Sequence, residues 1–284
     1  MISRVIREDS VIKLGESGRV IEPDILLEEM KPFGVPCFLG RGTWFDTELK
    51  WYPRDTEMLY DENMKDDRKR KLLEKNGWNK DSITYKLNKQ GFRHDGSVNN
   101  FHTVKPGGIA YVGDSNIFGI GNRLEDTFTH LAHPKHLPYI NLGCPGAGID
   151  SYYRVVKKWV PVIKPTLLLV FHTWVQTRTE FGDSNGSRFV VTRNFEDDKF
   201  HNFDPMDVHI RWHKNIDAIK WICAKAGTKV WVMEEPPNDE LYPEFFERYP
   251  DMKKDVYSRD LVHAGPEWHK DISKPLEEII HGNL

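Results

Sequence analysis

The chain has 284 residues; 40 are lysine or arginine and 43 are aspartate or glutamate, so the formal net charge is −3. This balance argues against a nucleic-acid binder that works through a general basic field. Apolar residues make up 39% of the chain, which is enough for a sizeable core and too many for a disordered protein.

Membrane and disulfide-rich classes are also excluded. No stretch approaches the roughly 20 apolar residues that a membrane helix needs, and residues 1–10 carry charges where a signal peptide needs an apolar run. We therefore expect a cytoplasmic protein, with incorporation into a larger particle left open. The three cysteines, Cys37, Cys144 and Cys223, have neither metal-ligand spacing nor the pattern of a disulfide framework.

The first part of the chain differs from the rest. Residues 1–60 hold short apolar pieces interrupted by glycine and proline, and residues 58–80 are mostly charged. Mixed-sign charges at this density are typical of a solvated helix face more often than of a binding patch. We predict that residues 1–84 form an extension packed on a main domain of residues 85–284. The extension would cap the site or make a homo-oligomer or assembly contact.

From residue 106 onward, strand-like and helix-like segments alternate. Short apolar runs predict buried strands, and apolar positions at helical spacing predict helices. The alternation predicts an α/β fold with a parallel sheet covered on both faces, in which ligands bind at the carboxyl ends of the strands. The predicted strands are 109–112, 139–142, 167–171 and 229–233, and the predicted helices are 149–163, 208–222 and 266–280.

A serine follows the first of these strands, in the sequence Gly113-Asp114-Ser115-Asn116. At a strand-to-helix junction Ser115 would lie at the sheet edge, where helix N–H groups can stabilise an oxyanion. Serine is also a common N-cap residue. From these residues alone, the N-cap is the favoured interpretation.

The second strand leads into a glycine-rich run that contains Gly143, Cys144 and Gly146. Glycines allow the backbone to approach a ligand closely, but from this run alone a simple turn before a helix is the favoured interpretation. No neighbouring motif supports Cys144 as a nucleophile, and we expect it to be a buried structural cysteine.

Asp260 and His263 precede the last predicted helix. A nucleophilic serine needs a base within hydrogen-bond reach, and the base needs an orienting group. A separation of three residues lets the carboxylate hold the imidazole N–H within one turn. The pair therefore provides a candidate base and its orienting acid.

The sequence lacks the motifs and residue spacings that other kinds of active or binding site require. There is no Gly-x-Ser-x-Gly nucleophile elbow and no phosphate-binding Walker loop, and Gly119-Ile120-Gly121 lacks the third glycine of a dinucleotide site. Two histidine groups suggest metal sites, but prolines interrupt the first and the second has no clear third ligand. The first group is His130, His133 and His136, and the second is His209 and His213. We expect no metal ion at either group.

Taken in order, these pieces resemble the SGNH (GDSL-type) hydrolase superfamily. Gly113-Asp114-Ser115 matches its first block, Asn141 to Gly146 its second, and Asp260-x-x-His263 its last. Residues 87–93 also look like a segment found ahead of the serine block in some bacterial and phage members. The resemblance implies a flavodoxin-like three-layer α/β/α sandwich with a mainly parallel five-stranded sheet. It also implies a Ser115–His263–Asp260 triad, with the Ser115 and Gly146 N–H groups in the oxyanion hole.

One block departs from the family pattern. The family carries an asparagine after the central strand as a third oxyanion donor, whereas this chain reads Phe171-His172-Thr173-Trp174-Val175-Gln176. His172, Thr173 and Gln176 are the alternatives, and we nominate His172. Loss of such a donor typically costs about 10²–10³ in rate.

The resemblance thus implies a serine esterase that needs no cofactor and no metal. It would act on a small-molecule or carbohydrate ester such as an acetyl ester, with Asp114, Asn116, Thr173 and Trp174 lining the substrate site. The alternative is a binding or structural protein that kept the fold and lost catalysis. The polar segment 178–205 is long for a strand-to-helix loop and is a candidate lid.

Overall fold

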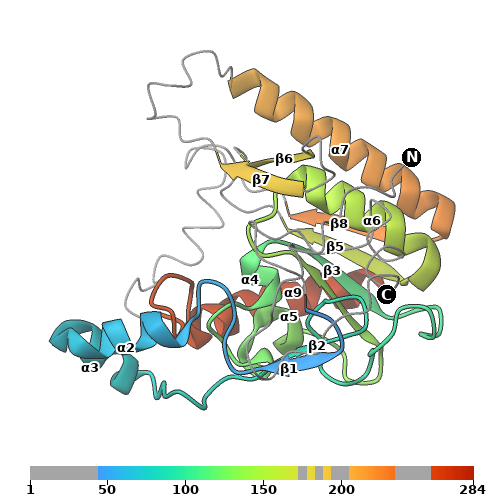
Figure 1. The fold of residues 1–284 in the computed structure, drawn as a ribbon. Helices are drawn as coiled ribbons and strands as arrows, with labels where there is room; N and C mark the ends of the chain where they lie inside the picture. The colour runs from blue at the N-terminus through green and yellow to red at the C-terminus, as the bar shows by residue number, and fades with distance from the viewer. Residues whose placement is uncertain (1–43, 172–177, 183–187, 193–204, 234–256) are drawn as a thin grey trace, which may run out of the picture.

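The computed structural model describes residues 44–171, 178–182, 188–192, 205–233 and 257–284. Its centre is a parallel sheet in the order β4-β3-β5-β8 (Figure 1). The chain crosses from β3 to β4 on one side and returns to β5 on the other, so β3 and β5 flank the topological switch point where ligands bind in such sheets. The four strands are β3 (Ile109–Gly113), β4 (Tyr139–Gly143), β5 (Leu167–Phe171) and β8 (Lys229–Met233).

This arrangement confirms the predicted α/β class and is consistent with a flavodoxin-like sandwich. The order corresponds to the first four strands of the flavodoxin pattern 2-1-3-4-5. All four predicted strands are present. The expected fifth strand is not among the described residues, whose central sheet has four.

Helices cover both faces of the sheet because successive strand residues point to opposite sides. In β3, Ala110 and Val112 pack into a core shared with α6 (Ile149–Ile163) and α7 (Pro205–Ala226). Ile109 and Tyr111 pack into a second core with α4 (Ser115–Phe118), α5 (Phe128–Leu131) and α9 (Pro266–Asn283). Figure 1 shows the two helical layers on either side of the sheet.

The helix boundaries follow the stop signals in the sequence. α6 spans the predicted residues 149–163. Its C-cap is Lys164, which has a φ of 48° and is followed by Pro165. α7 extends beyond its prediction and ends before Gly227, whose φ of 73° is the left-handed conformation that glycine adopts readily. No helix among the described residues is both long and apolar enough to cross a membrane.

The charged stretch 58–80 forms two short helices. α2 (Glu57–Lys65) is capped by Thr56, and Asp66 ends it and caps α3 (Asp67–Lys75). On α3, Arg70 pairs with Asp67 at 2.8 Å and with Glu74 at 3.8 Å, all on the exposed surface. These contacts confirm the prediction of a solvated helix face.

Residues 44–84 share a core with the main domain. β1 (Thr47–Leu49) pairs antiparallel with β2 (Tyr85–Leu87), across the predicted boundary. A buried cluster joins residues of the segment to Phe118 and Ile120, two residues that lie shortly after Ser115 in the chain. From the segment it includes Tyr52, Tyr60, Leu73, Trp78 and Ile83. The division at residue 84 stays a prediction.

The candidate lid differs from its prediction as a loop. β6 (Arg178–Gly182) and β7 (Arg188–Thr192) pair antiparallel in this region. Phenylalanine and threonine occur in both segments, and valine occurs twice in the second; these residues favour strands over loops. The predicted turn at 183–187 lies outside the described residues. A 3₁₀ helix, η2 (Leu124–Asp126), completes the description.

Candidate active site

Ser115 is the first residue of α4, two residues after β3 ends. Asp114 is the N-cap, because its carboxylate accepts the Asn116 N–H at 2.9 Å. The N-cap interpretation of Ser115 was therefore wrong by one position. Aspartate caps as well as serine does, and with Asp114 in this role the Ser115 hydroxyl is free for other contacts.

The turn that presents Ser115 is tightly packed. A Cβ on Gly113 would lie 2.3 Å from the Ile117 side chain, and one on Gly143 would lie 2.5 Å from the Phe118 nitrogen. The Cys144 N–H donates to the Gly113 carbonyl at 2.9 Å. The end of β4 is thus held against the start of α4, which brings the second sequence block beside Ser115.

Ser115, His263 and Asp260 form a continuous hydrogen-bonded line. The Ser115 Oγ lies 2.9 Å from His263 Nε2, although the residues are 148 positions apart. The other ring nitrogen, Nδ1, lies 2.5 Å from Asp260 Oδ2. The imidazole of His263 is partly exposed, whereas Ser115 and the Asp260 carboxylate are buried. The sequence-predicted base and acid are therefore brought together with the predicted serine.

Several groups hold the Asp260 carboxylate in its ionised form. Oδ1 accepts the N–H groups of Val262 and His263 at 3.0 Å each, and it also accepts the Ser258 hydroxyl. Burial acts to raise the pKa of Asp260, but hydrogen bonding and charge from His263, with the Ser258 bond, outweigh it and lower the pKa below 3.8. The carboxylate can therefore stabilise a positively charged imidazole.

The Asp260 loop depends on close approach by Gly121. Its carbonyl accepts the Arg259 N–H at 2.8 Å, and its φ is 71°. A Cβ at Gly121 would lie 2.8 Å from the Ser258 side chain and 3.1 Å from Asp260 Oδ1. Glycine is therefore required by both the backbone conformation and the space.

A buried arginine closes the far end of α4. Arg93 donates to the carbonyls of Phe118, Gly119 and Asn122 at 3.1, 2.6 and 2.9 Å. The last carbonyls of a helix lack intrahelical partners, and this side chain satisfies them. The segment 87–93, singled out in the sequence by resemblance, thus shapes the loop between Ser115 and Gly121.

The second block serves the same junction. The Asn141 side chain donates to the Ile117 carbonyl and accepts the Gly143 N–H, both at 2.8 Å. Cys144 is fully buried, as a structural cysteine would be. Gly146 has a φ of 77° and is partly exposed, three residues beyond the end of β4.

The remaining predicted site residues fall into two groups. Asp114 is buried as the N-cap, and Asn116 is partly exposed next to Ser115. The other positions, His172, Thr173, Trp174 and Gln176, lie outside the described residues. The roles assigned to all of them stay predictions.

The histidines at 130, 133 and 136 gather no ligand set. His133 is occupied by the Tyr111 hydroxyl at 3.1 Å and the Leu137 carbonyl at 2.8 Å. His213 is exposed on α7, and the side chain of His209 is not described. Within the described ranges, no group of three or more histidine, cysteine or acidic residues is placed to hold a metal ion.

His269 is a buried histidine that sequence reasoning missed. It lies in the first turn of α9, its Nδ1 accepts the Phe128 N–H at 3.2 Å, and its Nε2 lies 3.2 Å from the Asn122 side chain. Burial, with smaller effects of His263 and Arg93, lowers its pKa from 6.5 to about 3. Its position in the amphipathic pattern of the last helix was the available signal.

Acidification is expected to destabilise the protein through His269. Between pH 6.5 and 3 the unfolded histidine binds a proton that the folded one refuses, so the free energy of unfolding falls with falling pH. At about 1.4 kcal/mol per pKa unit, the full loss is roughly 5 kcal/mol. Urea unfolding over this pH range measures the free energy of unfolding, which should change less steeply with pH in His269→Gln than in the unmodified chain. Equal pH dependence in the two proteins would contradict the low pKa of His269.

Comparisons with known proteins add little to this geometry. No family model and no curated protein matches the sequence. A solved structure titled as that of TesA is similar over 62% of this chain and 99% of that chain, with 12% identity and a TM-score of 0.39. The fold class therefore stands on the sheet order and the two helical layers described above.

Proposed function

We propose that the protein is a serine hydrolase that cleaves esters by acyl transfer. The observation that supports the proposal is the line of two hydrogen bonds, 2.9 Å from Ser115 Oγ to His263 Nε2 and 2.5 Å from His263 Nδ1 to Asp260 Oδ2. A nucleophile, a base and an orienting acid in this order are the parts that acyl transfer needs.

The proposed reaction has two steps. The Ser115 Oγ attacks the ester carbonyl while His263 Nε2 takes the hydroxyl proton, and that proton then goes to the departing alcohol. Water next attacks the acyl-serine, giving its proton to His263, and the carboxylic acid leaves as Ser115 recovers its proton. Asp260 accepts the Nδ1 hydrogen bond and stabilises the imidazolium in both steps.

The developing oxyanion needs hydrogen-bond donors. We assign the N–H groups of Ser115 and Gly146 to this role, with His172 as the third donor. Ser115 starts α4, where the first N–H groups have no intrahelical acceptor and so remain able to donate to a developing oxyanion. No cofactor is needed for this chemistry. Small acyl esters, including acetyl groups on carbohydrate, are the proposed substrate class.

A second candidate function rests on the third block. Because residues 171–176 contain no asparagine, a binding or structural protein that has lost catalysis is the alternative. Such a protein would keep the hydrogen-bonded line without an oxyanion hole able to support attack. The two candidates differ in whether the folded protein activates Ser115.

A fluorophosphonate probe separates the two candidates. It reports activation directly, because attack by Ser115 Oγ forms a phosphorus–oxygen bond and expels fluoride. We expect one adduct per chain, mapped to Ser115 by mass spectrometry, in the native protein. Urea-unfolded protein and the His263→Ala variant should react far more slowly. A native protein that stays unmodified would refute the hydrolase proposal and favour the non-catalytic one.

A further inference from the structure

The residue that precedes Asp260 is a fully buried arginine. The Arg259 guanidinium forms a two-pronged ion pair with Asp55, with Nε 3.0 Å from Oδ1 and Nη2 2.6 Å from Oδ2. The two residues are 204 positions apart, and their side chains are 0% and 1% exposed. Bidentate pairs of this kind restrict both distance and angle.

Within the part of the chain that the structure describes, three further contacts of this guanidinium come from the N-terminal segment. Nη1 donates to the Lys80 carbonyl at 3.1 Å and Nη2 donates to the Lys50 carbonyl at 2.7 Å. The Trp51 ring lies against it, with its centroid 4.0 Å from Cζ. A buried charge is tolerated only when it is paired and hydrogen-bonded, and residues 50–80 supply these partners.

A second route leads from Asp55 back to the same loop. Asp55 Oδ2 accepts the Tyr85 hydroxyl at 2.5 Å, and the Tyr85 oxygen accepts the Gly121 N–H at 2.8 Å. The Gly121 carbonyl accepts the Arg259 N–H at 2.8 Å. The contacts therefore close into a cycle through Arg259, Asp55, Tyr85 and Gly121.

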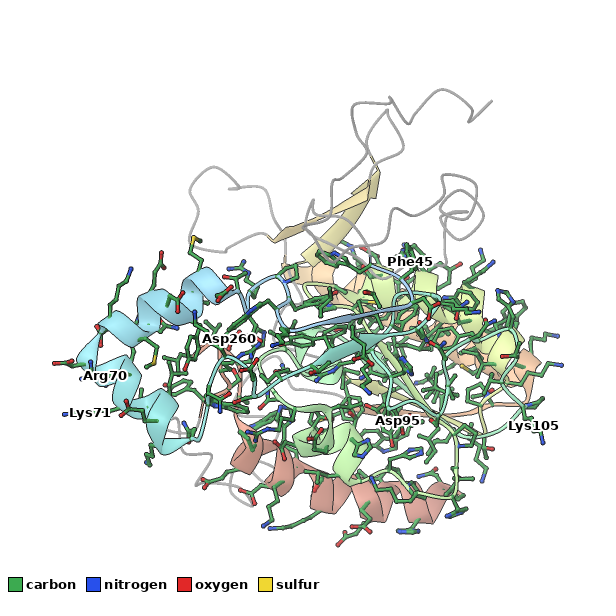
Figure 2. The ribbon with its side chains drawn as sticks, turned by 60° about the horizontal axis from the view of Figure 1, so that its bottom comes forward. Phe45, Arg70, Lys71, Asp95, Lys105 and Asp260 are labelled. Carbon is green, nitrogen blue, oxygen red and sulfur yellow. The ribbon has the colours of Figure 1, made fainter. Side chains whose placement is uncertain are left out.

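Two members of the cycle, Arg259 and Gly121, adjoin Asp260. Arg259 is its backbone neighbour, and the α-carbon of Gly121 faces Asp260 Oδ1 so closely that a Cβ there would lie 3.1 Å away. Figure 2 shows Asp260 on the side of the molecule that carries α2 and α3. Burial and the adjacent Asp55 raise the pKa of Tyr85 well above 10, so the phenol keeps the proton that it donates.

We propose that the Arg259–Asp55–Tyr85–Gly121 cycle positions the Asp260 carboxylate for its hydrogen bond to His263. The N-terminal segment would then be a working part of the active site rather than a separate module. The inference rests on the proposed function, because it assigns positioning residues to that triad. Rigid support of this kind matters because a misplacement of about 1 Å can cost 10²-fold in rate.

The sharpest test is Tyr85→Phe. This variant removes one oxygen, and with it the bonds to Asp55 and Gly121, and keeps the Arg259–Asp55 ion pair. We expect kcat for 4-nitrophenyl acetate to fall about tenfold while KM stays within about twofold, since only placement of the acid changes. The downfield proton resonance of the short His263 Nδ1–H bond should shift upfield in the NMR spectrum.

The matched control is Ile83→Val. Ile83 is buried in the same cluster as Tyr85 and takes no part in the cycle, so the control lowers the melting temperature without moving the acid. It should keep the wild-type kcat and the wild-type resonance. A purely structural cycle would make Tyr85→Phe behave like this control, with a lower melting temperature alone, and that result overturns the inference.

The design separates failure of the inference from failure of the proposed function. If the wild-type protein does not hydrolyse the ester and resists the fluorophosphonate, the hydrolase proposal fails. The resonance then decides the inference by itself, because it reports the His263–Asp260 bond without turnover. A shift in Tyr85→Phe that is absent in Ile83→Val supports positioning, and unchanged resonances in both reject it.

Discussion

Ser115→Ala should abolish ester hydrolysis, with kcat for 4-nitrophenyl acetate falling about 10⁶-fold, the loss seen when a serine hydrolase loses its nucleophile. The variant removes the oxygen that lies 2.9 Å from His263 Nε2 and leaves the rest of the site in place. The N-cap of α4 should survive, because Asp114 makes that contact. Stability should therefore change little while turnover is lost.

The control for this variant is Ser151→Ala. Ser151 is a buried serine of α6 that takes no part in the hydrogen-bonded line, and its hydroxyl has no hydrogen-bond partner among the described residues. It should retain wild-type turnover. Steady-state assays with matched protein concentrations and a thermal melt of each variant make the comparison. Equal rates from Ser115→Ala and the wild type would remove Ser115 from the mechanism.

Asp260→Asn should lower kcat by about 10⁴-fold, the effect of the same change in a serine protease triad. The amide carries no charge to stabilise the imidazolium. Its oxygen can keep the bonds that Val262, His263 and Ser258 donate to Oδ1, but its NH2 group then faces His263 Nδ1 and cannot accept the Nδ1–H hydrogen bond. KM should stay close to its wild-type value, because the carboxylate is buried away from substrate.

The matched control here is Asp271→Asn, which removes a charge from the exposed surface of α9, where Asp271 pairs with Lys274 at 3.2 Å. Exposed pairs contribute little to stability, and this control should keep full activity. If Asp260→Asn also keeps full activity, the line of hydrogen bonds does not carry catalysis. Fluorophosphonate labelling rates would then show which residue activates Ser115.

Much of the fold was predictable because local sequence patterns indicate its strands and helices. A strand buried on both faces is apolar throughout, as in Leu167–Phe171. In a helix buried on one face, apolar residues recur every three to four positions, as in Ile149–Ile163. Once strands and helices alternate, chirality and burial leave few ways to arrange them. The strand order in the sequence therefore also predicted that Ser115 lies at the carboxyl edge of the sheet.

The hairpin and the cap show where local patterns were insufficient. Asp114 and Ser115 are both good N-caps, and only the backbone geometry decided between them. Segments 178–182 and 188–192 have five residues each, too few to predict strands within a mostly polar stretch, and their pairing as β6 and β7 supplies the hydrogen bonds that make them strands. Neither choice is set by residue type alone.

The sequence by itself determined the layered α/β class and nominated Ser115, Asp260 and His263, because a separation of three residues and a strand-to-helix junction are local features. Only the tertiary structure decided what supports them. Asp55 and Arg259 are 204 residues apart, and each alone is an ordinary charged residue. Folding buries both, and a buried charge must find its partner, which ties the N-terminal segment to the loop of the acid.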